Sequence, residues 1–393
     1  MSKILKIGVM GIERGEFILR ASQFLKDEMV VSAVCELNDA TIEKQRHFFS
    51  EETKVYKDFD EFINSGLDGV VLCNYFHEHA KYAIKAMEAG VPVLSETTAA
   101  PSLGECIDLV EAYERTGTKY MLAANCPYFK PVHAMIDNLK SEKYGKVLYA
   151  EAEYIHAAPK GTVRKEPDPN NLHWRNTLPC CYYNMHSLGP LMYITGTVPV
   201  KVTGKAVKYD VPGKLTNVPK TFSLTEMDSG AVFCTTGVVN AGITSKWFRV
   251  SCEYGTMETL RDDWKEEWLF EFDAADKFTK TWEGWVSSGC ITKEEEAKYG
   301  SAIESVGHGG IDFILTLEFL KALRGEKEIF FDVYRSVALS AAGILTWYSI
   351  LDSSKEYIIP DFRDKEAREV FRGDYRVPFG KTLDEITLPY RLD

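Results

Sequence analysis

The regular alternation of strand and helix signals in the first third of the chain constrains its fold most strongly. Apolar, strand-like runs alternate there with amphipathic helical runs, and the connections between them are short. The run Gly69–Cys73 is continuously apolar, as is typical of a strand buried on both faces of a parallel sheet. This alternation predicts a doubly wound parallel sheet. The predicted strands are Ile4–Met10, Val30–Cys35, Gly69–Cys73, Val91–Leu94 and Tyr120–Ala123, and the predicted helices are Glu16–Lys26, Ala40–Phe49, His79–Ala89 and Leu103–Thr116.

The pattern changes after Asn125. Longer strands such as Val147–Ile155 follow one another with tight-turn signals between them, which indicates an antiparallel sheet. Helical patterns return late, for example over Val333–Leu351. Because 393 residues are too many for one ordinary core, we predict two domains. These are a Rossmann domain over residues 1–124 and an α+β domain with an open, mainly antiparallel sheet over residues 125–393.

Charge and cysteine content exclude several classes of partner. The chain has 46 basic and 58 acidic residues, a net charge of −12, which disfavours a nucleic acid or an anionic membrane. No apolar stretch reaches the ~18 residues of a membrane span, and the N-terminus lacks a signal-peptide pattern. The nine cysteines are widely spaced without a CxxC motif, so we expect free thiols, no metal site and a cytoplasmic location. The vicinal pair Cys180–Cys181 is either a packing element or, more rarely, a redox pair.

A glycine turn lies between the first predicted strand and helix, where a dinucleotide fold presents a pyrophosphate to a helix N-terminus. Gly11, Ile12 and Gly15 are therefore predicted to contact the cofactor NAD. The turn departs from the G-x-G-x-x-G pattern, because Glu13 replaces the second glycine and Gly15 comes one place early. A carboxylate facing a pyrophosphate would be repulsive, so Glu13 must point away or the cofactor must bind differently.

Two further features favour a NAD site. Glu36 ends the second predicted strand about 20 residues after the turn, where a carboxylate binds ribose hydroxyls and would repel the 2′-phosphate of NADP. Asn74 and His79 follow the strand that ends at Cys73, at the carboxyl edge where such sheets bind ligands. The alternatives are a solvated strand end for Glu36 and a metal pair at His77 and His79, for which no third ligand lies at a useful spacing.

The stretch Leu172–Pro190 is crowded with polar and aromatic side chains. It has too many groups that need partners for an ordinary core element and too many rings for a disordered linker. We interpret it as the wall of a small-molecule site, with Trp174 and Arg175 as substrate contacts. Packing between domains is the alternative for these two residues. The polar and aromatic residues of the stretch are His173, Trp174, Arg175, Tyr182, Tyr183, Asn184, His186 and Ser187.

Several of these segments together resemble the Gfo/Idh/MocA oxidoreductase family. The similar segments are the first strand with its glycine turn and Glu36, the His79 segment, Gly90–Glu96 and Gly307–Asp312. The resemblance implies the two-domain architecture, bound NAD(H) with a contact at Glu96, and a carbohydrate-like substrate. Family dehydrogenases usually carry Glu-Lys-Pro at this place, and the lysine helps to move the hydroxyl proton. This chain has Thr97 there, and a threonine hydroxyl is no acid–base at neutral pH, so another group must take that task.

A branch of the family that also lacks this lysine is formed by NAD-dependent glycosidases of the α-N-acetylgalactosaminidase type. The segments Glu151–His156, Tyr183–Pro190, Asn125–Tyr128 and His308–Phe313 are similar to motifs of that branch. In this chemistry the sugar is oxidised at C3, which makes the C2 proton acidic, and its removal expels the C1 substituent. Water then adds and the hydride returns.

The resemblance makes Tyr154 the candidate base at C2. His186 would assist at the C3 hydroxyl with Tyr183 as its neighbour, and Asn125 and His308 would contact the substrate. A tyrosine ordinarily has a pKa of ~10, so a positive charge such as the guanidinium of the predicted wall or NAD⁺ has to favour its phenolate. The structural alternatives are a core tyrosine, a helix-capping His186 and a backbone-orienting His308.

Two rival functions stay open at this point. One is a net sugar or polyol dehydrogenase. The other is a non-catalytic NAD-binding sensor, which the presence of Glu13 and the absence of the lysine would suit. No spacing singles out a pair of carboxylates for a classical glycosidase. An exposed sheet face in the second domain would favour a homo-oligomer, either a dimer or a tetramer.

Overall fold

The computed structural model describes residues 3–157, 172–174, 177–208, 220–241, 244–261, 269–273, 278–282 and 291–392. The chain divides into two compact units. The first unit comprises Met1–Ala100, Glu105–Tyr128 and Gly289–Ser336, and the second comprises Pro101–Gly104, Phe129–Ser288 and Val337–Asp393. A single boundary after residue 124 therefore does not describe this division, because a late segment of the chain belongs to the first unit.

The sheet of the first unit confirms the predicted doubly wound fold. Among the described residues, six parallel strands form it in the order β3-β2-β1-β4-β5-β6. The chain reverses its direction of winding between β1 and β4, and open α/β sheets bind ligands at such a point. The strands are β1 (Leu5–Met10), β2 (Met29–Cys35), β3 (Lys54–Tyr56), β4 (Gly69–Leu72), β5 (Val93–Ser95) and β6 (Tyr120–Leu122). The short edge strand β3 was not predicted.

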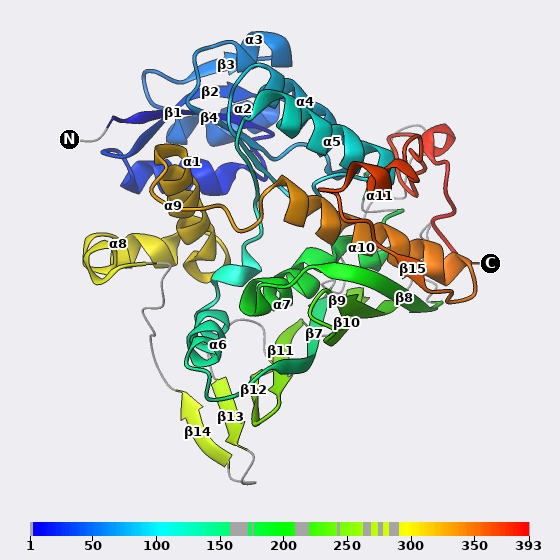
Figure 1. Ribbon diagram of the computed structural model, residues 1–393. Coiled ribbons are helices and arrows are strands. Elements are labelled where there is room, and N and C mark those ends of the chain that lie inside the picture. Colours follow the sequence, from blue (N-terminus) through cyan, green and yellow to red (C-terminus); the bar gives the residue numbers. More distant parts are fainter. Residues whose placement is uncertain are drawn as a thin grey trace. The chain divides into compact units, whose positions relative to one another are not determined.

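Helices of two distant parts of the sequence pack in the first unit. Helix α9 contacts α1, and a Cβ atom on Gly69 of β4 would lie 2.9 Å from Leu323 and 3.1 Å from Phe319 (Figure 1). Nearly every side chain of α9 is buried, so this helix completes the core of the first unit. The helices are α1 (Glu16–Phe24), α2 (Asp39–Gln45), α3 (Phe59–Ile63), α4 (His79–Glu88), α5 (Leu103–Thr116), α8 (Lys293–Ser305) and α9 (Ile311–Arg324).

The second unit is built on the predicted, mainly antiparallel sheet. Its described strands have the order β14-β13-β12-β11-β7-β10-β9-β8-β15, and among them β7 and β10 form the one parallel pair. The long central strand β7 lies between β11 and β10, so it can present side chains in the middle of the sheet. The strands are β7 (Val147–Ala157), β8 (Pro199–Val207), β9 (Lys220–Met227), β10 (Val232–Ala241), β11 (Ser245–Cys252), β12 (Gly255–Thr259), β13 (Leu269–Asp273), β14 (Phe278–Trp282) and β15 (Tyr357–Ile358).

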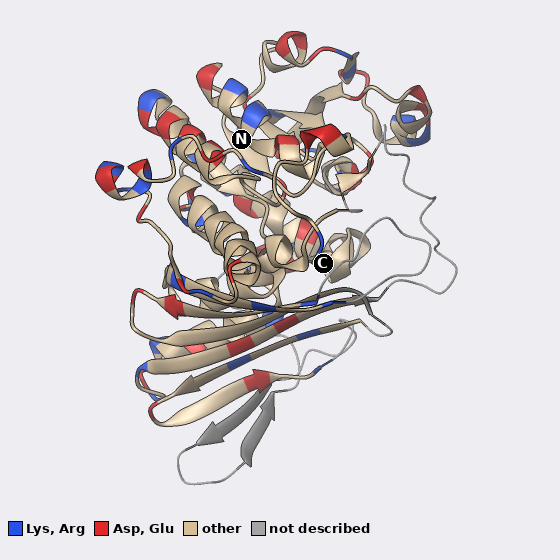
Figure 2. Cartoon of the chain, turned by 90° about the vertical axis from the view of Figure 1, so that its right-hand side faces the viewer, with Lys and Arg blue, Asp and Glu red and all other residues tan. Residues whose placement is uncertain are grey.

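The two faces of this sheet differ. On the inner face, Gly204 of β8 lies so close to α10 that a Cβ atom would come within 2.5 Å of the Thr346 carbonyl oxygen. On the outer face, Arg249 forms ion pairs with Glu151 and Glu258 of the two neighbouring strands. Basic and acidic positions occur on neighbouring strands of this sheet (Figure 2). The remaining helices are α6 (Lys130–Lys140), α7 (Leu188–Thr195), α10 (Val333–Leu351) and α11 (Lys365–Glu369). No helix in the described part of the chain is long and apolar enough to cross a membrane.

Candidate functional site

The glycine turn of the first unit has the backbone that a dinucleotide site needs. Gly11 has a φ of +78°, and a Cβ atom there would lie 2.5 Å from the Cys73 carbonyl oxygen, so only glycine fits. Gly15 stands before α1, and a Cβ atom on it would lie 2.6 Å from Val9. The side chain of Glu13 is exposed, so its carboxylate is hydrated instead of being enclosed in the turn.

The carboxylate of Glu36 lies beside this turn, as predicted. The backbone N–H of Ile12 donates to its Oε2 at 3.3 Å, and the N–H of Asn38 donates to its Oε1 at 2.9 Å. These two bonds hold the carboxylate at the end of β2, next to the helix N-terminus that would receive a pyrophosphate. The residues of the turn and Glu36 therefore fit a dinucleotide with free ribose hydroxyls.

His79 and Asn74 shape the loop after β4. The His79 imidazole is buried, with Nδ1 3.0 Å from the Thr98 carbonyl oxygen and Nε2 3.2 Å from that of Asn74. Burial lowers the pKa of His79 to about 4, although both carbonyl contacts raise it, so the ring is neutral at pH 7. Both ring nitrogens face carbonyl oxygens, which favours the predicted role in the loop over a metal pair with His77.

The buried side-chain amide of Asn74 has no hydrogen-bond partner on either atom within the described residues. Buried amide groups normally have hydrogen-bond partners, so a buried amide without a partner in the protein indicates a place where a ligand or a water molecule binds. Asn74 stands at the carboxyl end of β4, beside the switch point of the sheet. The cofactor contact of Asn74 stays a prediction, and the unsatisfied amide is compatible with it.

A cluster of charged side chains joins three predicted site residues through two that were not predicted. Arg14 places Nη2 2.5 Å from Glu96 Oε1 and Nη1 3.5 Å from Asp312 Oδ2. Asn125 donates from Nδ2 to Asp312 Oδ1 at 3.0 Å, and His308 Nδ1 lies 2.8 Å from Asp312 Oδ2. We call Arg14, Glu96, Asn125, His308 and Asp312 the Asp312 cluster. The only signal for it in the sequence was the spacing of His308 and Asp312, four residues apart at a helix start.

Asp312 is the anionic centre of this cluster. Its side chain is buried, which by itself raises the carboxyl pKa, but the His308 hydrogen bond and the Arg14 charge outweigh burial and lower the pKa to about 2. The carboxylate is thus ionised at neutral pH and accepts from every neighbour. An ionised carboxylate fixes the orientation and tautomer of an imidazole that it contacts.

The structure brings the three predicted catalytic residues together in the second unit. Tyr154 on β7 stacks on His186, with ring centroids 4.5 Å apart, and lies 5.8 Å from the Tyr183 ring. The Tyr183 and His186 rings are 4.8 Å apart. Tyr154 and His186 are buried and Tyr183 is half-buried. A phenol and an imidazole in this proximity can both take part in proton transfer. We call these three residues the Tyr154 cluster.

A short helical segment, η5 (Cys180–His186), positions two members of the Tyr154 cluster. The Asn184 amide donates to the Leu339 carbonyl oxygen at 2.9 Å, which ties η5 to α10. Gly343 of α10 allows this close approach, because a Cβ atom there would lie 2.6 Å from the Cys181 carbonyl oxygen. The predicted contact Trp174 is half-buried and stacks on His173, whereas Arg175 lies outside the described residues.

Lys246 is a further residue at the Tyr154 cluster that was not predicted. It stands opposite Tyr154 in the pairing of β11 with β7, and its Nζ lies 6.0 Å from the Tyr154 ring centroid. The Lys246 ammonium group therefore supplies a positive charge near the Tyr154 side chain. From the sequence, Arg175 or NAD⁺ was expected to supply this charge. The strand register that creates this pair cannot be read from the sequence alone.

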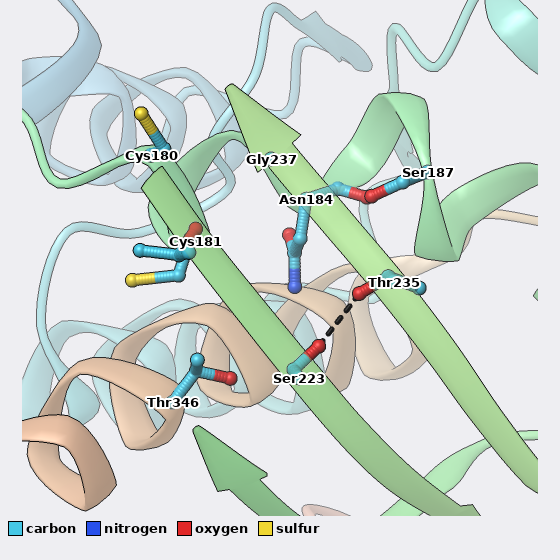
Figure 3. Close-up of a pocket in the computed structure, with 9 residues that line it drawn as sticks. Cys180, Cys181, Asn184, Ser187, Ser223, Thr235, Gly237 and Thr346 are labelled. Atoms are coloured by element: carbon cyan, nitrogen blue, oxygen red, sulfur yellow. Dashed lines mark hydrogen bonds between the residues drawn. The ribbon is translucent and has the colours of Figure 1, made fainter. Parts of the chain in front are cut away.

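A small polar cavity lies behind η5 (Figure 3). The Ser223 and Thr235 hydroxyl groups, 2.6 Å apart, are hydrogen-bonded on its wall. Cys180 and Cys181 also line it; both are free thiols that point in different directions, and burial raises the pKa of Cys181. Packing therefore explains this pair better than redox chemistry.

Two segments of the chain match models of known protein families. Residues 4–124 match the oxidoreductase family with an NAD-binding Rossmann fold, GFO_IDH_MocA. Residues 272–367 match the C-terminal domain of glycosyl hydrolase family 109.

Two curated relatives are similar to this chain over most of its length. A glycosyl hydrolase family 109 protein of Shewanella sp. is 24% identical, with 92% of this chain and 85% of the relative covered. An α-N-acetylgalactosaminidase of Tannerella forsythia is 25% identical, with 84% and 80% covered.

Solved structures share the fold. Levoglucosan dehydrogenase in complex with NADH and L-sorbose has a TM-score of 0.71 at 18% identity, with 92% of this chain and 100% of that chain covered. An NAD-binding oxidoreductase from Klebsiella pneumoniae has a TM-score of 0.71 at 17% identity, with 91% and 99% covered.

Proposed function

The chain belongs to the Gfo/Idh/MocA oxidoreductase family and carries a glycosyl hydrolase family 109 C-terminal domain, and from this premise we propose that it cleaves glycosides with NAD. The cleavage would proceed through transient oxidation of the sugar at C3. The observation that carries the proposal is the Tyr154 cluster, because it unites a phenol, an imidazole and a second phenol. Redox-neutral elimination needs a base at C2 and an acid–base at C3.

The first unit would hold the cofactor. Gly11 and Gly15 let the backbone approach a pyrophosphate, and Glu36 would bind the ribose hydroxyls, which favours NAD over NADP. The orphaned amide of Asn74 would find its partner there. NAD⁺, when bound, accepts a hydride from the sugar and returns it at the end of the cycle.

Tyr154 would remove the C2 proton as a phenolate. A phenolate is favoured by a nearby cation, and the ammonium group of Lys246 stands on the facing strand at 6.0 Å from the ring centroid. His186 would hold the C3 hydroxyl and accept its proton, and Tyr183 would donate a hydrogen bond at the same place. Trp174 and Arg175 stay proposed substrate contacts.

The outer sheet face of the second unit supports the proposal of a homo-oligomer. Tyr149, Phe222, Leu224 and Val232 are exposed there on neighbouring strands. Exposed apolar groups that adjoin one another mark an interaction surface. A second copy of the chain would cover them.

The proposal is tested by incubating the protein with a panel of aryl glycosides in D₂O, with and without NAD⁺. We expect hydrolysis that needs only catalytic NAD⁺, no steady rise of NADH absorbance, and deuterium at C2 of the released sugar. A stoichiometric rise of NADH would make the protein a net dehydrogenase. Tight NAD binding without turnover or C2 exchange on any glycoside would make it a sensor.

A further inference from the structure

We propose that Phe379, in a closed loop near the end of the chain, is a positioning residue for the acid–base groups on η5. This inference rests on the proposed function, because Tyr183 and His186 of η5 are two of its three acid–base groups. Phe379, η5 and the strand that carries Tyr154 all belong to the second unit, so the inference concerns that unit alone.

The backbone of η5 does not fix its own shape. Tyr183 has a φ of −99° and a ψ of 28°, so the segment bends there and is not one regular helix. Before the bend, the Tyr182 N–H donates to the Pro179 carbonyl oxygen at 3.1 Å. After it, the Ser187 N–H donates to that of Asn184 at 3.0 Å. Each of these bonds closes a single turn, which has little stability of its own. The positions of the rings on η5 therefore depend on contacts with other elements.

Helix α10 supports the backbone of η5 at the Asn184 amide and at the Cys181 carbonyl group. Neither contact holds the Tyr182 ring. That ring packs edge-on against Phe379, with ring centroids 5.3 Å apart and ring planes at 85°. Both rings are buried, and edge-to-face is a favourable geometry for an aromatic pair. Phe379 therefore holds the residue directly before Tyr183.

The loop that carries Phe379 is closed at its base. The Val377 N–H donates to the Thr387 hydroxyl at 3.0 Å, and the Thr387 N–H donates to the Val377 carbonyl oxygen at 3.0 Å. We call residues 377–388 the C-terminal loop. Directly after it, Trp347 Nε1 of α10 donates to the Pro389 carbonyl oxygen at 2.6 Å. Compact loops whose ends meet are frequently functional. This one is tied to the same helix that supports η5.

The C-terminal loop contacts the predicted wall Leu172–Pro190 at a second place. The Leu172 N–H donates to the Lys381 carbonyl oxygen at 2.7 Å, two residues before Trp174. Between this contact and η5 lies Thr177, whose buried hydroxyl has no hydrogen-bond partner within the described ranges. Such a hydroxyl indicates a place where a ligand or a water molecule binds. The loop therefore holds both sides of a stretch that is suited to contact a substrate.

The decisive variant is Phe379→Ala. Removal of the ring leaves a cavity beside Tyr182 into which η5 can move. A displacement of about 1 Å from the productive geometry lowers the rate by up to about 100-fold. We therefore expect kcat for glycosides to fall about 10- to 100-fold while NAD affinity stays within twofold. Phe379→Leu refills most of the space, so we expect it to lower kcat by only about threefold.

Phe362 offers a matched control for the loss of a buried ring. It is 2% exposed, against 0% for Phe379, and lies in the second unit before α11. We expect Phe362→Ala to lower the melting temperature about as much as Phe379→Ala does, because both leave a cavity, but to keep kcat within twofold. Equal kcat values of the two alanine variants, measured where both are folded, would overturn the proposal.

Hydrogen exchange of the backbone amides measures the positioning of η5 without a substrate. We expect the Tyr182 and Ser187 amides to exchange about tenfold faster in Phe379→Ala than in the wild type, and at the wild-type rate in Phe362→Ala. If Phe379→Ala does not fold, Phe379→Leu takes its place with a smaller increase. Exchange of η5 at the wild-type rate in the Phe379 variant would contradict the proposal. If the wild type cleaves no glycoside, the proposed function fails alone, and the exchange still decides whether Phe379 positions η5.

Discussion

The Asp312 cluster of the first unit and the Tyr154 cluster of the second differ in how their members are held. The Asp312 cluster is held by ion pairs and hydrogen bonds, and its members come from sequence positions almost 300 residues apart. The Tyr154 cluster is held by ring contacts between β7 and η5. A group held by ion pairs depends on the ionisation of its members, whereas rings in contact are held by their packing geometry. The geometry of the first cluster therefore depends on the charges of its members, whereas that of the second depends on how its rings pack.

We expect the largest effect when Tyr154, the proposed base of the Tyr154 cluster, is replaced. We expect Tyr154→Phe to lower turnover by about 10³-fold while NAD affinity stays within twofold, because the substitution removes only the hydroxyl group and keeps the ring. Steady-state hydrolysis and NAD titration measure the two effects.

Tyr128 offers a matched control for this substitution. It is a tyrosine of the first unit with the same exposed fraction as Tyr154, 8%. We expect Tyr128→Phe to retain most of the turnover. If Tyr154→Phe kept its turnover and Tyr128→Phe lost it, the base would have to be sought in the first unit instead of the second.

The glycine turn should show the next largest effect. Gly11→Ala places a Cβ atom 2.5 Å from the Cys73 carbonyl oxygen at a φ of +78°, so the backbone must shift. We expect NAD affinity to fall by about 100-fold and the free energy of unfolding by about 3 kcal/mol, because strain and a backbone clash add. Calorimetry and NAD titration measure the two losses.

Gly66→Ala separates the effect of backbone strain at a positive φ from the effect of the steric clash at Gly11. Gly66 has a φ of +85°, but a Cβ atom there meets nothing within 4 Å. We expect a loss of about 1 kcal/mol in unfolding free energy and unchanged NAD affinity. Equal effects of the two substitutions would show that the close approach at Gly11 does not matter.

The same comparison shows what could be predicted from the sequence. The members of the Tyr154 cluster were predicted from the resemblance of two segments to motifs of the NAD-dependent glycosidases, since Tyr183 and His186 lie within one short segment and Tyr154 on one strand. The Asp312 cluster was predicted only in part, because Arg14 and Asp312 meet through the packing of α9 on α1. An amphipathic pattern predicts a helix and its apolar face, but not the sheet that the helix covers. The return of Gly289–Ser336 to the first unit was missed for the same reason.

The pairing of Lys246 with Tyr154 was missed for a different physical reason. Tyr154 was placed on the predicted strand Val147–Ile155, but the sequence does not fix which residue of the neighbouring strand lies opposite it. A shift of one residue in register would put Lys246 on the opposite face. The register depends on packing across the whole sheet and on turn geometry. Contacts between residues on neighbouring strands are thus harder to predict from the sequence than contacts within one short segment.

The last prediction concerns the pH dependence of stability at His79, which belongs to neither cluster but joins the loops after β4 and β5. Its pKa is lowered to about 4 by burial, whereas an unfolded chain protonates histidine near pH 6.5. Between these values the unfolded state binds more protons, so stability falls as the pH falls. We expect His79 alone to lower the unfolding free energy by about 1.5 kcal/mol between pH 6.5 and 5.0.

Denaturant unfolding of the wild type and of His79→Gln at the two pH values isolates this contribution. Glutamine can donate to a carbonyl oxygen but does not titrate, so the variant should lose less stability over the interval by that amount. The Asp312 carboxyl, with a pKa of about 2, loses its stabilising charge only below this interval and cancels in the comparison. Equal losses in both proteins would mean that His79 is protonated in the folded state, and that both carbonyl contacts are then charge-assisted hydrogen bonds.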